Sequence, residues 1–170
     1  SNTAVGNSAL YSNSASYNTA IGNVALYANT SGANNVAIGT SALRFNTTAS
    51  ENTAVGYQSL NTNVTGAGLT AVGFQAGYSS ANGAGTGYNT FVGRLSGYSL
   101  TTATDTIFIG NATGYSTTTG SENTAVGSVS FYSNTTGTRN TVFGREALFN
   151  NTTASNNTAV GYQSLYTSNG

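Results

Sequence analysis

The amino-acid sequence predicts an all-β protein, a parallel β-solenoid (β-roll) of ten coils of about 17 residues each. Three observations predict it: a short phrase that returns along the whole chain, β-branched residues two positions apart within that phrase, and Asn-Thr stretches between apolar segments. β-Branched residues two apart favour a strand, whereas Asn and Gly favour turns. No apolar segment keeps a helical period over the roughly 10–12 residues that a helix needs.

The repeat is carried by the phrase Asn-Thr-Ala-Val-Gly, which is found at residues 2–6, 52–56, 123–127 and 157–161 and in variant forms between them. The glycine that ends the phrase anchors each coil, and successive anchors are spaced 16, 17, 17, 17, 20, 17, 17, 17 and 17 residues apart. The step of 20 predicts a small loop insertion at residues 80–87. The anchors are Gly6, Gly22, Gly39, Gly56, Gly73, Gly93, Gly110, Gly127, Gly144 and Gly161.

The chain is predicted to be a single repeat array over residues 1–170. A longer period lies above the coil, because residues 43–60 are nearly repeated at residues 148–165, 105 positions further on (43 to 148). This duplication of blocks predicts that the chain is a segment of a longer array.

The residue before each anchoring glycine is apolar in every coil, and we expect this column to form the core or the assembly contact. Two residues earlier the column is mostly Thr, and between the two lies a column of mostly Ala. Both faces of the strand are therefore expected to be buried, with Thr lining the interior and Ala packing against other chains as a homotrimer. The core or assembly column is Val5, Ile21, Ile38, Val55, Val72, Val92, Ile109, Val126, Phe143 and Val160.

A second apolar position, four residues after the anchor, predicts a second short strand in each coil. It holds Leu or Phe in seven coils and Gly in the other three. The next position is mostly aromatic. We expect Tyr78, Tyr98 and Tyr115 to be candidate glycan-binding residues, because the adjacent glycine would leave their rings accessible. The alternative is that the rings stack simply because the coils repeat.

A third column, of asparagines in the turn after the aromatic position, admits two interpretations. Asn29, Asn46, Asn63, Asn134 and Asn151 each begin an Asn-x-Ser/Thr sequence, so they are candidate glycosylation sites. The alternative is a hydrogen-bonded ladder of amides at the turn.

The inventory of side chains argues against an enzyme. The chain contains no His, Cys or Lys, so no catalytic residue, metal site or cofactor is expected. Asp105 and Glu122 share a column with Arg139, which indicates a carboxylate pair of the kind that hydrolyses glycosides, a weak cation site or an exposed ion pair of Glu122 and Arg139. Four Arg balance four acidic residues, so nucleic acid is not an expected partner. No apolar run approaches the ~20 residues of a membrane span, so this segment is not expected to insert into a membrane.

The Asn-Thr-Ala-Val-Gly phrase, followed by Ala-Leu or Ser-Leu and an Asn-Thr-Thr-Gly-like turn, resembles the head repeats of trimeric autotransporter adhesins. It is similar also to the repeat arrays of phage tail-fibre-like proteins, and the resemblance covers all ten repeats. The resemblance implies a left-handed β-roll of three chains on a cell or virion surface.

We therefore expect a structural component of an extracellular or virion fibre or adhesin. It would be a rod that spaces or displays binding elements and that associates with itself as a trimer or filament. Two alternatives remain: a module that binds cell-surface glycans or another surface through its aromatic column, and an ice-binding solenoid that uses its Thr column.

Overall fold

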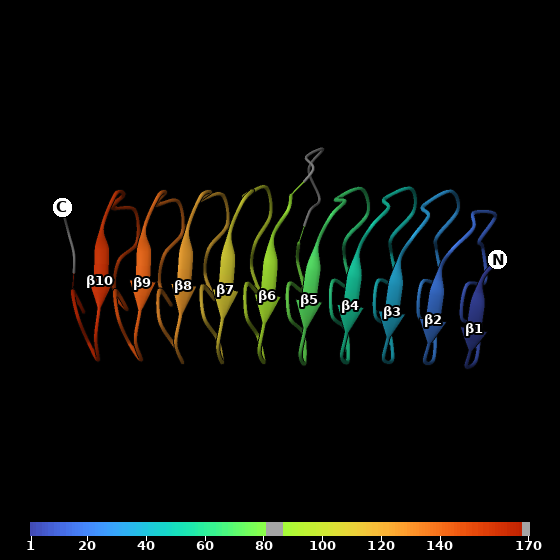
Figure 1. The fold of residues 1–170 in the computed structure, drawn as a ribbon, viewed down its shortest axis with the longest axis horizontal. Helices are drawn as coiled ribbons and strands as arrows, with labels where there is room; N and C mark the ends of the chain where they lie inside the picture. Colours follow the sequence, from blue (N-terminus) through green and yellow to red (C-terminus); the bar gives the residue numbers. More distant parts are fainter. Residues whose placement is uncertain (81–86, 168–170) are drawn as a thin grey trace.

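The computed structural model describes residues 1–80 and 87–167 and shows a parallel β-solenoid (Figure 1). Ten three-residue strands, one from each coil, lie side by side in chain order in a single parallel sheet. The predicted all-β solenoid is confirmed, whereas most of the predicted insertion at residues 80–87 lies outside the described residues. The strands are β1 (Thr3–Val5), β2 (Thr19–Ile21), β3 (Val36–Ile38), β4 (Thr53–Val55), β5 (Thr70–Val72), β6 (Thr90–Val92), β7 (Ile107–Ile109), β8 (Thr124–Val126), β9 (Thr141–Phe143) and β10 (Thr158–Val160).

The coils stack in register, so each position of the repeat lies beside the same position of the next coil. Between β3 and β4, for example, Ala37 pairs with Ala54 and Ile38 pairs with Val55. The columns of the sequence repeat are therefore columns in space that run along the rod. A residue type is accepted in a column only if it can pack against copies of itself.

The anchoring glycines are required by both the backbone and the stacking. Gly39 has a φ of 131°, a conformation that is essentially restricted to glycine. A Cβ atom at this position would lie 2.5 Å from the carbonyl oxygen of Gly56 in the next coil. The column is thus fixed as glycine because the chain leaves the strand here at close approach to the neighbouring coil.

The predicted second strand of each coil is wrong, because the described return segment consists of turns. Its backbone visits the left-handed region at two positions, as at Val24 and Leu26, both with a φ of 49°. The N–H of Val24 donates to Asn7 of the preceding coil at 2.9 Å, whereas the N–H of Leu26 donates to Ala42 of the following coil at 3.0 Å. The return segment is hydrogen-bonded to both neighbours without forming a regular ladder.

The expected core column is turned outward, which corrects the orientation of the strand. Val5, Ile21, Ile38, Val72, Ile109, Phe143 and Val160 are exposed, from 37% for Ile38 to 69% for Val160, and Val55, Val92 and Val126 are half-buried. The expectation that Thr lines the interior is also wrong, because that column is half-buried or exposed. The interior is filled by the middle residues of β2–β10 and by the Leu column, as with Ala37 and Leu43, which are fully buried.

The reason for this orientation is the narrow width of the coil. Successive side chains of a strand point to opposite faces, so a three-residue strand turns either one or two of them inward. Only one side chain of the strand fits opposite the leucine of the return segment, and it is alanine in most coils and Val142 opposite Leu148. The chain therefore turns the central residue inward and leaves Thr and Val or Ile on the outside.

The middle coils use a different pair of residues to fill the same space. Phe91 and Phe108 replace the inner alanine, and both are fully buried. Glycine replaces the leucine opposite, and a Cβ atom at Gly97 or Gly114 would collide with the ring of Phe91 or Phe108, respectively. The rings of Phe91, Phe108 and Phe131 follow one another with centroids 6.1 Å apart. One large and one minimal side chain thus occupy the volume of Ala and Leu.

Because Phe with Gly and Ala with Leu fill the same space, a second substitution in the same coil should restore stability lost at Phe91. Replacing Phe91 by Ala should leave a cavity and lower the free energy of unfolding by about 3–5 kcal/mol. The additional change Gly97→Leu restores the Ala–Leu pair of the other coils, in which Leu26 and Leu43 already adopt a similar φ. We expect the double variant F91A/G97L to recover at least half of the loss in urea denaturation. No recovery would contradict the shared volume of the two positions.

Candidate functional site

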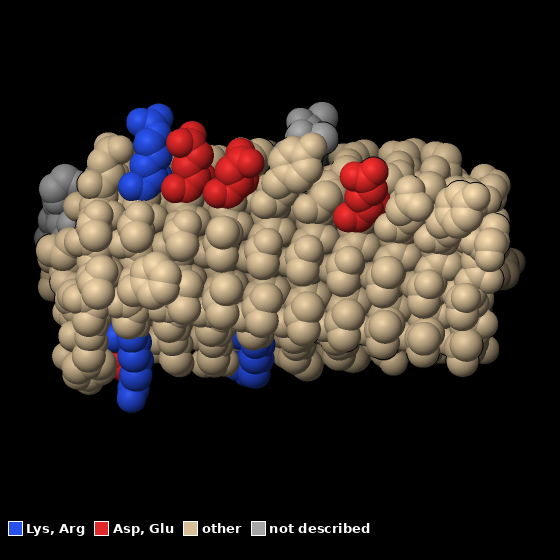
Figure 2. All heavy atoms as spheres, in the orientation of Figure 1, with Lys and Arg blue, Asp and Glu red and all other residues tan. Residues whose placement is uncertain are grey.

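The most extensive candidate surface is the outer side of the ten-stranded sheet, here called the sheet face. It consists of the first and third residues of β1–β10, which are mostly Thr and mostly Val or Ile, respectively. None of them is charged. In the orientation of Figure 1, acidic and basic residues lie along the two long edges of the molecule and the area between them is free of charge (Figure 2). The sheet face is therefore an uncharged strip that carries a row of mostly aliphatic side chains.

Three residues interrupt the regularity of the sheet face. Val36 and Ile107 stand where most strands have Thr, and Phe143 stands where the others have Val or Ile. Ile107 and Phe143 are 40% and 45% exposed. The sheet face is thus more apolar than the consensus phrase indicates, and the ring of Phe143 makes it uneven at β9.

A second candidate surface is a stack of aromatic rings on the return segment, here called the tyrosine ladder. Its members are Tyr78, Tyr98, Tyr115, Tyr132, Phe149 and Tyr166. Neighbouring centroids lie 5.1–5.3 Å apart and the planes differ by 4–10°. This is the offset stacked geometry that aromatic pairs favour, worth about 0.5–1.5 kcal/mol for each pair. The alternative interpretation of the column, stacking of repeated rings, is what the structure shows.

The rings of Tyr78, Tyr98 and Tyr115 are less accessible than the neighbouring glycines led us to expect. The space left by the glycines beside them is occupied by Phe91 and Phe108 from the strand, so the three rings are half-buried and not fully accessible. Both faces of Tyr98 and of Tyr115 are covered by neighbouring rings. A sugar cannot stack on a ring whose faces are covered, so any ligand of these tyrosines must meet ring edges and hydroxyl groups.

The candidate glycosylation sites belong to a buried amide ladder. Asn29, Asn46, Asn63, Asn134 and Asn151 are all 0% exposed. Asn46 donates from Nδ2 to Oδ1 of Asn29 at 2.9 Å and to the carbonyl oxygen of Ala49 at 2.9 Å. Asn63 donates to Oδ1 of Asn46 at 3.0 Å in the same way. The folded chain has no room for a glycan on these nitrogens, and the ladder is the interpretation that the structure favours.

A second amide ladder precedes the strands. Nδ2 of Asn35 donates to Oδ1 of Asn18 in the preceding coil at 3.2 Å, and Oδ1 of Asn35 accepts from the backbone N–H of Asn52 in the following coil at 3.0 Å. An amide carries both a donor and an acceptor, so a column of identical amides satisfies itself. The two ladders hold the two ends of the loop that joins the return segment to the next strand.

The buried amide ladder that contains Asn29 predicts that two asparagines of one coil contribute differently to the free energy of unfolding. Asn29→Ala removes the bonds to Asn13 at 2.6 Å and to Gly32 at 2.8 Å, and takes away an acceptor of Asn46. We expect the free energy of unfolding to fall by about 1–3 kcal/mol for each buried group left without a partner. Asn23→Ala, an exposed position of the same coil, should change it by less than about 0.5 kcal/mol. Equal effects in chemical denaturation would contradict the role of the ladder.

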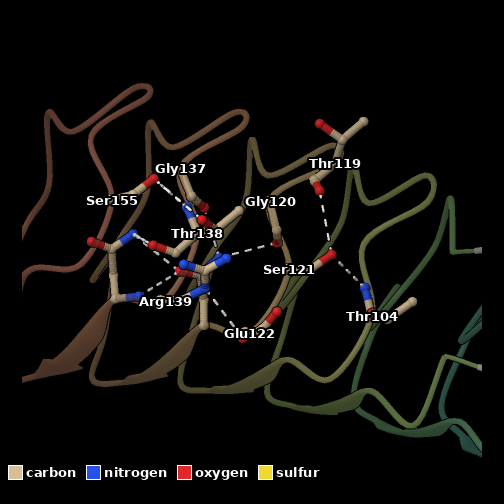
Figure 3. Close-up of polar contacts among 11 residues, drawn as sticks. Thr104, Thr119, Gly120, Ser121, Glu122, Gly137, Thr138, Arg139 and Ser155 are labelled. Atoms are coloured by element: carbon tan, nitrogen blue, oxygen red, sulfur yellow. Dashed lines mark hydrogen bonds and ion pairs between the residues drawn. The ribbon is translucent and has the colours of Figure 1, made fainter.

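The charged column at the edge of the sheet shows an ion pair. Nε of Arg139 lies 3.4 Å from Oε2 of Glu122, and both side chains are more than half exposed. In Figure 3 this contact lies beside hydroxyl contacts of the same loops, such as the N–H of Thr104 donating to Oγ of Ser121 at 3.0 Å. An exposed pair of this kind contributes at most about 1 kcal/mol. The ion-pair interpretation of the column is the one that the geometry supports.

A further charged group lies at Glu146. The Gln163 amide, which donates to Oε2 at 2.7 Å, and the adjacent Arg145 guanidinium hold the pKa of the Glu146 carboxyl below its usual value. Among residues 1–80 and 87–167, no three acidic, His or Cys side chains gather in a way that could hold a metal ion. The same residues include no helix that is long and apolar enough to cross a membrane.

Searches against protein-family models, curated proteins and solved structures find no match to this chain. The resemblance to trimeric adhesin heads and tail-fibre repeats stays a prediction. The sequence reasoning named the Val and Ile column as core or assembly contact, but it missed that this column and the Thr column share one outer face. The sequence does contain a signal for this orientation. In the two coils in which the middle strand residue is Phe91 or Phe108, the leucine position is glycine, at Gly97 and Gly114. A large residue in one column matched by glycine in the other indicates that both columns face the same interior, which places Val and Thr outside.

Proposed function

We propose that this chain is a structural rod that associates with identical copies through its sheet face, three chains around a common axis. The assembly would form part of a fibre or adhesin on the surface of a bacterium or a virion, and it would space or display binding elements. The observation that carries the proposal is the long uncharged strip of exposed or half-buried Val, Ile and Phe side chains along ten strands. Contiguous apolar strips of this extent mark interaction surfaces.

The sheet face suits a partner with the same repeat. Copies related by an axis parallel to the rod bring the same coil of each chain together, so Val and Ile of one chain meet Val and Ile of the next over the whole length. The proposal thus replaces the Ala column with the Thr and Val column as the contact between chains. No charge has to be buried, which removes the largest cost of closing such an interface.

Association is not needed to complete the interior of the rod. The accessible surface of the single chain is 6908 Å², below the roughly 7,700 Å² typical of a protein of this mass, 17.1 kDa. Stacking of the coils already buries the inner columns. Variants that prevent association should therefore remain folded as single rods, which makes the proposal testable by substitution.

Ice binding is the second candidate, and the outward Thr-x-Val pairs of β4 and β5 favour it. An ice plane is flat and rigid, so its ligand must be flat and regular over several coils. Val36 and Ile107 break the Thr column, and Phe143 rises from the sheet face. A protein partner can accommodate these irregularities with a matching shape, whereas a crystal plane cannot. The same surface therefore suits a protein better than ice.

The test is the mass in solution, measured by light scattering behind a sizing column. We expect about three times 17.1 kDa for the natural chain. The variant I38K/I109K places two cations on the sheet face and should have the mass of a single chain, with little change in thermal stability. T48K/T119K introduces the same charge on exposed loop residues of the same two coils and should keep the natural mass.

A single-chain mass for the natural protein would contradict the proposal. If thermal hysteresis accompanied that mass and disappeared in I38K/I109K, the ice-binding alternative would take its place. If the unsubstituted protein had the mass of three chains and I38K/I109K had the same mass, the chains would associate through another surface.

A further inference from the structure

Four consecutive coils display the same pair of hydroxyl groups on the return segment. The pairs are Tyr78 and Ser79, Tyr98 and Ser99, Tyr115 and Ser116, and Tyr132 and Ser133, and all eight residues are half-buried. The side-chain hydrogen bonds of the described residues in these coils involve other groups, such as Oγ of Ser96 with Phe108 and Oγ of Ser130 with Gly127. The four pairs, here called the Tyr-Ser row, therefore keep their hydroxyls available for a ligand.

The spacing of the Tyr-Ser row is fixed by the backbone. The N–H groups of Ser79, Ser99 and Ser116 donate to the carbonyl oxygens of Tyr98, Tyr115 and Tyr132, each at 3.1 Å. The rings that follow one another lie 5.1 Å apart in all three steps. A preorganised row of this kind binds without the cost of ordering its own side chains. A ligand that matches it must place one unit beside each coil.

The Tyr-Ser row is neutral, and this limits the kinds of ligand that it can bind. None of its residues carries a charge, and burial, with a smaller effect of Tyr115 and Tyr78, raises the pKa of the Tyr98 phenol, so that its hydroxyl stays protonated. Each coil offers two hydroxyls that both donate and accept hydrogen bonds. These features suit a neutral polymer rich in hydroxyl groups and do not suit a polyanion.

We propose that the Tyr-Ser row binds a straight β-1,4-linked polysaccharide, which lies parallel to the rod with one sugar ring for each coil. In such a polymer both bonds to the ring are equatorial, so the chain is an extended ribbon whose step from ring to ring is close to the coil spacing. Successive rings of this ribbon are turned over, so they present opposite edges to the row in alternation. The phenol and serine hydroxyls of each coil both donate and accept hydrogen bonds, so they can meet either edge. An α-1,4-linked glucan coils and loses the match after one or two units.

The proposal does not depend on self-association. The leucine position that precedes each tyrosine packs against the inner side of the strand, so the tyrosine lies on the side of the coil away from the sheet face. Contacts at four coils add together because the second and later contacts are intramolecular. Weak individual hydrogen bonds thus suffice to hold the rod on an insoluble polysaccharide.

The test is adsorption of the natural protein to microcrystalline cellulose and to chitin, with cross-linked amylose as the coiled control polymer. The variant Y98F/Y115F/Y132F removes three phenol hydroxyls and keeps the stacked rings. We expect its partition onto the β-1,4-linked polymer to fall at least about tenfold, with an unchanged melting temperature. Y17F/Y88F/Y162F removes three exposed hydroxyls that lie outside the tyrosine ladder and should adsorb like the natural protein.

Adsorption to cellulose, to chitin or to both, lost in the ladder variant alone, supports the proposal, and the two polymers tell whether an acetamido group is tolerated. Absence of adsorption to both polymers overturns it. Equal adsorption to amylose, or adsorption that the ladder variant retains, also overturns it. The mass in solution of each variant, measured in parallel, separates a failure of this proposal from a failure of association through the sheet face.

Discussion

The structure depends on one constraint, the in-register stacking of identical coils. Each coil hydrogen-bonds to the coil before it and the coil after it, so every side chain lies beside the equivalent side chain of its neighbours. A column is stable only when its residue type can contact copies of itself. Two like charges at 4 Å repel by about 1 kcal/mol even in bulk water, so stacking disfavours columns of one charge, and only 5% of the residues are charged. Amides, aromatic rings, glycine and aliphatic side chains all satisfy the condition, and they make up the columns of this protein.

The interior shows how the same constraint allows variation. Ala with Leu and Phe with Gly fill one volume in two ways, and the change occurs in neighbouring coils so that Phe91 packs on Phe108 and Phe108 on Phe131. The amide ladders tolerate Thr at a few positions because a hydroxyl also donates and accepts: Thr106 donates to Oδ1 of Asn89 at 2.8 Å. The rod is therefore regular in its backbone and adaptable in its side chains, which leaves the outer columns free to carry function.

The coil length, the strand positions and the columns could be predicted from the sequence, because the period and the β-branched alternation survive in nearly every repeat. The orientation of the strand could not be predicted from alternation alone. Val and Ile at the third position looked like the core, yet a three-residue strand opposite Leu43 has room only for Ala37 inside. The second strand was also predicted, but residues such as Leu26 adopt a left-handed backbone that a periodic apolar pattern does not reveal. For the site, the stacking of the tyrosines and the amide ladder were among the alternatives that the repeat itself suggested.

The two proposals assign separate roles to two outer surfaces of the coil: the apolar sheet face would contact other copies, and the neutral Tyr-Ser row would contact an extended ligand. The central claim, that chains meet in parallel through the sheet face, is tested most directly by distances between spin labels. The chain has no cysteine, so Val72→Cys and Val126→Cys each give one label for every copy. Parallel association through the sheet face predicts a short label-to-label distance that is the same at both coils. Distances that differ between the two coils, or no measurable distance between copies, would contradict it.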